Sequence, residues 1–218
     1  MKIATPLLLI SLTLVTLAQT PSDPRAQRAF SQVERIGEAN ARSFFVFTVG
    51  GRQYTVRHDG RGEITGPIFN KLRNFFLKLD GAARVDKLYS AEAGGDLLLT
   101  YEVANGKSGW GYVARFDPST PAFRWFAPIN SMNIGPGLIE GNYVYVTGQD
   151  FIAKLDLQTG KYVWQQTDFG KEYGPVFAQF ALPEINGDAI VFPEAGARAR
   201  TLEVDKATGR VLKGPASH

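Results

Sequence analysis

The sequence contains no cysteine and only two histidines, His58 and His218, among its 218 residues. Without cysteine there is no disulfide, no thiol nucleophile, no thiolate-rich metal site and no lipid-modified cysteine. Two histidines are too few for a histidine-ligated catalytic zinc, and His58 is interpreted as a partly buried strand residue rather than a general base. The acidic residues show no calcium-loop spacing. We therefore predict no catalytic residue, no metal site and no cofactor site.

Charge of one sign and long apolar runs are also scarce. The 24 Lys and Arg residues nearly balance the 21 Asp and Glu residues, for a formal net charge of +3, so we expect neither nucleic acid nor another strongly charged partner. The one apolar run, residues 7–17, follows Lys2 and precedes a small residue at position 18. It is short for a membrane span of about 30 Å. We predict a signal peptide at 1–18, no transmembrane span after its removal, and a periplasmic or secreted protein; an uncleaved anchor helix is the alternative.

What the sequence does contain is a repeat. Three segments align on an aspartate: YVARFDPSTPAFRW (112–125), FIAKLDLQTGKYVW (151–164) and RTLEVDKATGRVLK (200–213); a fainter copy, YTVRHDGRGEIT, covers 54–65. The aligned aspartates are Asp59, Asp117, Asp156 and Asp205. A Gly-Asp or Gly-Asn pair begins at 95, 141 and 187, an interval of 46 residues. Several short strands in a fixed period of this length are typical of a β-propeller.

Each recurring position has a structural reason. An aspartate at the end of a strand accepts backbone N–H groups of the following turn, and Gly160 and Gly209 can take the left-handed conformation that closes such a turn. Pro121 holds φ negative, so we expect a different turn there. Trp125 and Trp164 lie on the strand after the turn. We expect their burial between neighbouring sheets to contribute about 1.5–3 kcal/mol each.

Residues 141–164, GNYVYVTGQDFIAKLDLQTGKYVW, resemble the PQQ-type (quinoprotein-like) β-propeller repeat, and the resemblance extends over residues 81–213. That family includes quinone-dependent dehydrogenases and also cofactor-free propellers such as the outer-membrane assembly lipoprotein BamB. The repeat is a structural unit and does not by itself imply binding of pyrroloquinoline quinone. Because no catalytic residues are found, the resemblance implies the cofactor-free, BamB-like branch rather than the dehydrogenases.

The expected fold is mainly β, a small or partial β-propeller of about four PQQ-like blades that forms one domain over 19–218. Residues 24–81 are expected to be an atypical first unit with one or two short helices, and 82–213 three clearer repeats. The helices are predicted at 24–38 and 67–79, where apolar residues recur at helical spacing. The second helix is expected to cover a sheet or its edge, with a binding role as the alternative. A closed ring and a partial propeller completed by a homodimer through an open sheet edge are both compatible with these repeats.

One set of residues is a candidate binding site. Arg57, Arg115 and Lys154 stand two residues before a repeat aspartate, as Glu203 does in the last copy. If equivalent strands point these side chains the same way, the cations form a site for an anion or an acidic partner loop, with exposed Tyr101 and Trp110 beside it. A solvated strand face is the alternative.

From these residues the predicted function is an exported, non-catalytic interaction or scaffold module that binds a protein of the cell envelope through loops at its rim. Recognition of a small ligand (a quinone, a sugar or an anion) is the second hypothesis. An enzyme that uses carboxylates alone is the third.

Overall fold

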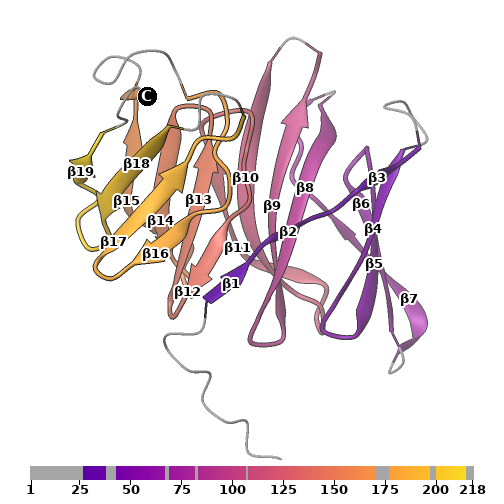
Figure 1. Ribbon diagram of the computed structural model, residues 1–218. Coiled ribbons are helices and arrows are strands. Elements are labelled where there is room, and N and C mark those ends of the chain that lie inside the picture. The colour runs from indigo at the N-terminus through magenta and orange to yellow at the C-terminus, as the bar shows by residue number, and fades with distance from the viewer. Residues whose placement is uncertain are drawn as a thin grey trace, which may run out of the picture.

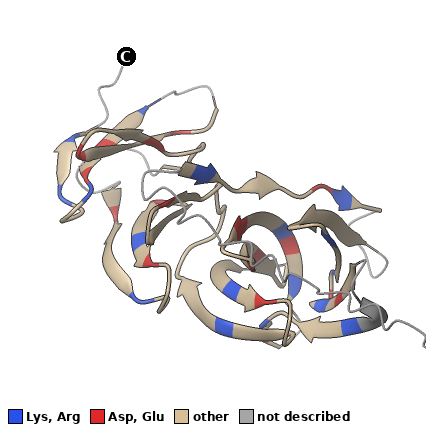
Figure 2. Ribbon diagram, turned by 90° about the horizontal axis from the view of Figure 1, so that it is seen from below, with Lys and Arg blue, Asp and Glu red and all other residues tan. Residues whose placement is uncertain are grey.

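The computed structural model describes residues 27–37, 43–66, 69–81, 83–106, 108–169, 177–196 and 200–214, so the predicted signal peptide lies outside the described residues. All the elements with defined bounds in this part are strands. They form four antiparallel sheets, which we number 1 to 4 in chain order. Sheets 1 and 4 lie at opposite ends of the molecule (Figures 1 and 2). The prediction of a mainly β protein is confirmed.

Each sheet has a core of four strands joined by hairpins. Sheet 1 consists of β4 (Phe44–Val49), β5 (Arg52–Arg57), β6 (Arg61–Gly66) and β7 (Phe69–Phe76). Sheet 2 consists of β8 (Arg84–Ala93), β9 (Asp96–Ala104), β10 (Gly109–Asp117) and β11 (Ala122–Ile129). Sheet 3 consists of β12 (Leu138–Glu140), β13 (Tyr143–Gly148), β14 (Phe151–Asp156) and β15 (Tyr162–Thr167). Sheet 4 consists of β16 (Glu184–Asn186), β17 (Ala189–Pro193), β18 (Thr201–Asp205) and β19 (Val211–Lys213).

Residues 27–36, which we call the strap, add a fifth strand to three of these sheets. The strap contains β1 (Gln27–Ala29), β2 (Ser31–Gln32) and β3 (Arg35–Ile36), which pair with β12, β8 and β4 respectively. It therefore runs along the first strands of sheets 3, 2 and 1, in that order (Figure 1). Between the short strands, Phe30 and Val33 are buried, and their N–H groups donate to Gly137 and Leu88 at 2.9 Å.

The helix predicted at 24–38 is therefore wrong for the described residues 27–37. A spacing of three between Phe30, Val33 and Ile36 fits a helix face, but it also fits a strand that bends from one sheet to the next. Phe30 and Val33 are buried, whereas Ile36 is exposed. The three sheet edges supply backbone partners that a local pattern does not reveal, and this pairing decides the conformation.

The helix predicted at 67–79 is also wrong where the structure describes it. Residues 69–76 form β7, paired with β6 so that Phe75 faces Gly62 and Phe76 faces Arg61. A helix would place Phe75 and Phe76 on one side, but in the strand Phe75 is buried and Phe76 is 66% exposed. Sheet 1 takes its fourth strand from this segment, and long-range pairing overrides the local helical pattern.

The hydrophobic core consists of three clusters, and each lies at the boundary between two consecutive sheets. The boundary between sheets 1 and 2 is rich in aromatic rings, with the centroids of Phe75 and Phe116 4.7 Å apart. The second boundary buries mostly aliphatic residues together with Trp125, and the third buries Trp164 with further aromatic rings, such as Phe177 and Phe180, whose centroids are 5.0 Å apart. Because the core lies between the sheets, the boundaries are where side chains of different repeats meet.

Candidate functional site

Three of the four aligned aspartates lie at equivalent turns. Asp117, Asp156 and Asp205 end the third strand of sheets 2, 3 and 4, just before the turn to the fourth strand. Asp59 instead lies in the turn between β5 and β6, the second and third strands of sheet 1. Consecutive hairpin turns lie at opposite ends of an antiparallel sheet, so Asp59 does not occupy the position predicted from the alignment.

The aspartate organises the turn through a single carboxylate oxygen. Oδ1 of Asp156 accepts the N–H of Thr159 at 2.8 Å and its hydroxyl at 2.8 Å, and Asp205 binds Thr208 in the same way at 2.8 and 2.7 Å. These hydrogen bonds, led by the threonine hydroxyls, lower the pKa of both aspartates. In sheet 2 the carboxylate of Asp117 accepts two hydrogen bonds from Ser119 at the corresponding turn.

Each tryptophan of the repeat binds the turn of the next sheet. The indole N–H of Trp125 donates to the carbonyl of Leu157 at 3.0 Å, and that of Trp164 donates to the carbonyl of Lys206 at 3.0 Å. A Cβ atom at Gly160, with φ of 69°, would come within 2.5 Å of the Trp125 ring. Glycine is therefore favoured at position 160 for two reasons: the backbone there is left-handed, and the indole lies too close for a side chain.

The two buried cations of the predicted charged site serve the same turns. Arg115 donates to the carbonyl of Leu157 at 3.0 Å, and Lys154 to that of Lys206 at 2.8 Å, so cation and indole share one acceptor at each boundary. Arg115 is 8% exposed and also binds Asp96 at 2.6 Å; Lys154 is 7% exposed. Arg115 and Lys154 thus each stabilise the contact between two sheets.

Arg57, the third cation of the prediction, lies in sheet 1, is exposed and pairs with Glu63 at 3.4 Å. The structure does not bring Arg57, Arg115 and Lys154 together, because Arg57 lies on the second strand of sheet 1 and the other two lie on the third strands of sheets 2 and 3. Glu203 lies in sheet 4, at the position of these cations.

The two aromatic residues predicted to be exposed are largely inside the molecule. Tyr101 is fully buried, and its hydroxyl donates to the carbonyl of Lys78 at 3.4 Å. Burial raises the pKa of the Tyr101 hydroxyl. Trp110 is half-buried against the first boundary and donates to the hydroxyl of Tyr112 at 3.1 Å, which donates to Asp80 at 2.5 Å. The β9–β10 hairpin therefore directs its aromatic residues toward sheet 1.

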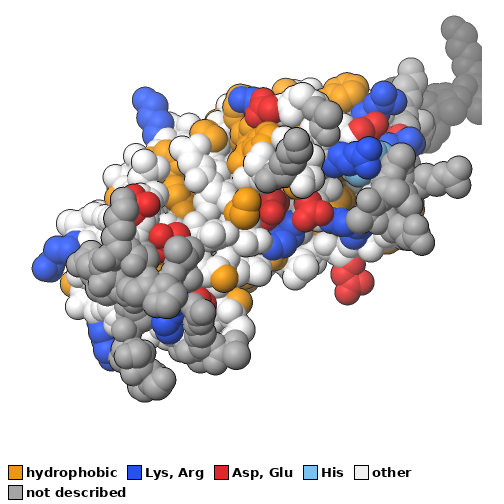
Figure 3. All heavy atoms as spheres, turned by 90° about the horizontal axis from the view of Figure 1, so that it is seen from above, with side chains coloured by type: hydrophobic (Ala, Val, Ile, Leu, Met, Phe, Trp, Pro, Cys, Tyr) orange, Lys and Arg blue, Asp and Glu red, His pale blue; other side chains and the backbone are white. Residues whose placement is uncertain are grey.

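The outer side of the first boundary carries an apolar depression of about 290 Å³, which we call the aromatic cleft. It is lined by Phe76, Lys78, Tyr101, Phe123 and Phe126. Phe76 is 66% and Phe126 48% exposed, and the ammonium of Lys78 lies 4.7 Å from the centroid of the Phe126 ring. Of the residues predicted to form a binding site, only Tyr101 lines this cleft. On the face seen in Figure 3, hydrophobic side chains form several separate patches among polar and charged ones.

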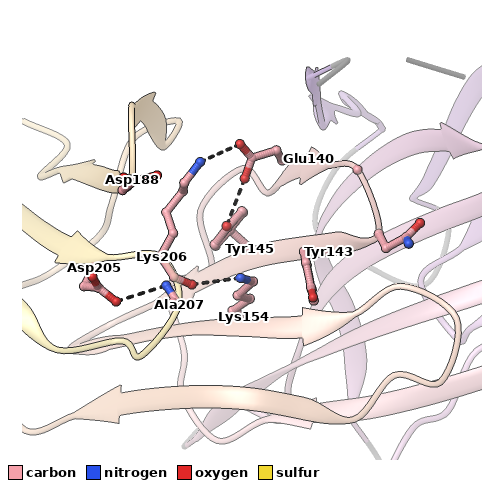
Figure 4. Close-up of a pocket in the computed structure, with 10 residues that line it drawn as sticks. Glu140, Tyr143, Tyr145, Lys154, Asp188, Asp205, Lys206 and Ala207 are labelled. Atoms are coloured by element: carbon pink, nitrogen blue, oxygen red, sulfur yellow. Dashed lines mark hydrogen bonds and ion pairs between the residues drawn. The ribbon is translucent and has the colours of Figure 1, made fainter. Parts of the chain in front are cut away.

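A second depression, the polar cleft, lies between sheets 3 and 4 and has a volume of about 630 Å³ (Figure 4). Glu140 accepts hydrogen bonds from Lys206 at 2.8 Å and from the hydroxyl of Tyr145 at 3.1 Å. The ammonium of Lys154 lies 3.9 Å from the centroid of the Tyr143 ring. Burial lowers the pKa of Lys154 and raises that of Tyr145.

Two of the three carboxylates of the polar cleft, Glu140 and Asp205, are held in structural roles. Both oxygens of Glu140 have donors, and Asp205 holds its turn with a lowered pKa. A carboxyl that acts as a general acid needs a raised pKa instead. In the part of the chain that the structure describes, no group of three or more Asp, Glu, His or Cys side chains is arranged to hold a metal ion. The described residues also include no helix with the length and apolar character needed to cross a bilayer.

Comparison with solved structures identifies proteins of similar fold. BamB from Moraxella catarrhalis has a similar structure, with a TM-score of 0.50 and 19% identity over 84% of this chain and 50% of BamB. Quinohemoprotein alcohol dehydrogenase from Comamonas testosteroni gives a TM-score of 0.43 and 18% identity over 57% of this chain and 20% of that protein. The computationally designed protein Ika8 gives a TM-score of 0.38 and 10% identity, covering 79% of this chain and 74% of Ika8.

No family model and no curated protein matches the sequence. The likeness to BamB shows that the chain has a propeller fold of the PQQ-like type, and the chain spans half the length of BamB. At 19% identity the likeness concerns the fold alone.

Proposed function

We propose that the chain is a non-catalytic protein of the cell envelope, exported by residues 1–18, whose remaining residues form one domain that binds a protein partner. The propeller fold shared with BamB supports this proposal, as does the lack of cysteine and of a histidine cluster. Two of the three carboxylates of the polar cleft, Glu140 and Asp205, are tied to structural donors, which leaves Asp188 alone there, whereas an enzyme that uses carboxylates alone needs two acidic groups facing one cleft.

The observation that carries the proposal is the aromatic cleft. Phe76 and Phe126 expose 66% and 48% of their surface on neighbouring outer strands, β7 and β11. Covering the exposed part of each ring with a partner would remove apolar surface from water and favour a complex, offset in part by the cost of ordering both surfaces. Exposed aromatic side chains that line a depression are typical anchors of protein interfaces.

Lys78 defines the chemistry of the partner. It is exposed, and in the described part of the chain its ammonium contacts the rings of Tyr112 and Phe126 while no carboxylate pairs with it. A partner side chain that enters the cleft would bring its neighbours close to this cation. We therefore propose that the partner presents an apolar side chain next to an aspartate or glutamate.

Site-specific photocrosslinking tests the surface. A photoreactive phenylalanine at position 126 should crosslink the partner in intact envelopes, and the crosslinked partner peptide should contain an apolar residue beside an acidic one. The same group at Val163, which is 47% exposed on β15 of sheet 3, is the matched control and should not crosslink it. Equal crosslinking from both positions would refute the aromatic cleft as the contact surface.

Substitutions test the energetics. Phe76→Ser with Phe126→Ser should abolish capture of the crosslinked partner, and Lys78→Glu should weaken it. Val163→Ser with Leu212→Ser removes two apolar side chains elsewhere that are 47% and 46% exposed, and it should leave capture unchanged. A second copy of this chain is the alternative occupant; a mass of two chains in sedimentation that returns to one chain in the Phe76 and Phe126 variant would identify it.

A further inference from the structure

The polar cleft between sheets 3 and 4 is not used by the proposed function and has the size of a small-molecule site. Its volume of about 630 Å³ lies within the range of about 300–1,000 Å³ that is usual for ligand pockets. Its floor belongs to strands of sheet 3, and its far wall to the β18–β19 turn of sheet 4 (Figure 4).

The wall of the cleft is held in place before any ligand arrives. The N–H of Lys206 donates to the carbonyl of Asp188 at 2.9 Å, and the carbonyl of Lys206 accepts from Lys154 at 2.8 Å and from Trp164 at 3.0 Å. The Lys206 ammonium is fixed by Glu140 at 2.8 Å. Such a wall needs little reordering when a ligand binds, which favours affinity.

The cleft also has hydrogen-bonding capacity left over. The Asp188 carboxylate and the Asn142 side-chain amide are exposed and bind no other described residue, and Lys206 has two ammonium protons beyond the one given to Glu140. Donors and acceptors therefore alternate around one opening. A ligand that carries several groups able both to donate and to accept would satisfy them.

The charges disfavour an ion. Three carboxylates, Glu140, Asp188 and Asp205, face two ammonium groups, Lys154 and Lys206. The carboxylates repel an anion, and the ammonium groups repel a metal cation. A neutral polar molecule avoids both costs.

Tyr143 supplies an apolar surface within this polar frame. Its side chain is 37% exposed, and Lys154 covers one face of the ring at 3.9 Å from the centroid. Small-molecule sites combine such an aromatic surface with a few fixed polar groups. The geometry points to a neutral saccharide: we propose that the polar cleft binds a sugar ring, whose C–H face packs on Tyr143 while its hydroxyls contact Asp188, Asn142 and Lys206.

Isothermal titration of the full chain with maltotriose, cellotriose and chitotriose tests this proposal. We expect saturable binding of at least one of the three. Tyr143→Ala should weaken that binding at least about tenfold, equivalent to about 1.4 kcal/mol, whereas Tyr143→Phe keeps the ring and should bind like the parent protein. Asp188→Lys is a second test in case Tyr143→Ala does not fold. The Asp188 carboxylate makes no hydrogen bond to a described residue in the parent protein, and this substitution should also abolish binding.

Three outcomes would overturn the proposal: no heat from any of the trisaccharides, equal binding by the parent and by a folded Tyr143→Ala or Asp188→Lys protein, or saturable binding of phosphate or Ca²⁺ without binding of a saccharide. Capture of a protein partner through the aromatic cleft is independent of all three, because no residue lines both clefts.

Discussion

The boundary between sheets 1 and 2 differs in chemistry from the two boundaries that follow it. At the second and third boundaries, an indole N–H and a cation both donate to one turn carbonyl of the next sheet. The first boundary has no tryptophan at this place. There Arg73 of β7 donates to the carbonyl of Ser119 instead.

The two kinds of boundary leave different clefts at their margins. Directional docking fixes the turn of sheet 4 by backbone hydrogen bonds and surrounds it with Lys154, Lys206 and Glu140, so the opening there is polar. At the first boundary Phe76 and Phe126 are exposed at the outer edge, so the opening there is apolar. The two margins therefore differ in the kind of group that they can bind.

The comparison extends to the last sheet. In sheets 2 and 3 the docking cation and the tryptophan are cross-strand partners, Arg115 with Trp125 and Lys154 with Trp164. In sheet 4 the same pair of positions holds Glu203 and Lys213. Neither side chain reproduces the paired donors of the other boundaries, so sheet 4 lacks the groups needed to dock a further sheet in this way. Self-association, if it occurs, must use other contacts.

The largest expected effect contrasts the two kinds of docking donor. Trp125→Ala removes a buried indole and its hydrogen bond to Leu157, and should lower the free energy of unfolding by about 3–5 kcal/mol. Arg73→Ala removes the exposed hydrogen bond to Ser119 at the first boundary and should cost about 1 kcal/mol. Urea unfolding followed by circular dichroism measures both. Equal losses would show that the first boundary also depends on a directional donor.

A smaller effect is expected from the turn beneath the indole. Gly160→Ala places a methyl group within 2.5 Å of the Trp125 ring and should destabilise the protein by about 2–4 kcal/mol through strain and overpacking. Gly187→Ala is the matched control: its φ is 59°, but no atom lies within 4 Å of the added carbon, so only about 1–2 kcal/mol of backbone strain is expected. If the two variants are equally stable, the indole does not constrain the turn.

The smallest effect concerns pH. Hydrogen bonds in the turn lower the pKa of Asp156 in the folded chain, so its carboxylate stabilises the fold above the pKa of the unfolded chain, about 3.9, and this contribution is lost as the pH falls through the lower folded value. Asp156→Asn should therefore be less stable than the parent at neutral pH, and the difference should shrink below about pH 4. Asp188→Asn, whose carboxylate makes no hydrogen bond to a described residue, is the matched control for the loss of one surface carboxylate. Urea midpoints at neutral and acidic pH provide the measurement.

The sequence reveals features that depend on local chemistry and misses those that depend on distant strands. The repeat leads to the turns at Asp117, Asp156 and Asp205 because a carboxylate and a hydroxyl act within a few residues, joined in the last two turns by a glycine. The strap and β7 read as helices, since an apolar spacing of three or four does not reveal the sheet edge that captures the segment. Both clefts lie between sheets, so their residues come from separate repeats and no single motif contains them.

The strap also has a consequence for the order in which the fold is completed. Its first strand, β1, pairs with β12, more than a hundred residues further along the chain, whereas its last strand, β3, pairs with nearby β4. The backbone groups of the earliest described residues therefore find their partners only after the third sheet has formed. Closing the long loop between β1 and β12 costs conformational entropy, which slows this step. We expect the strap to pair with the sheets from Ile36 back toward Gln27. During refolding, Gln27 should be the last residue of the strap to become protected from hydrogen exchange.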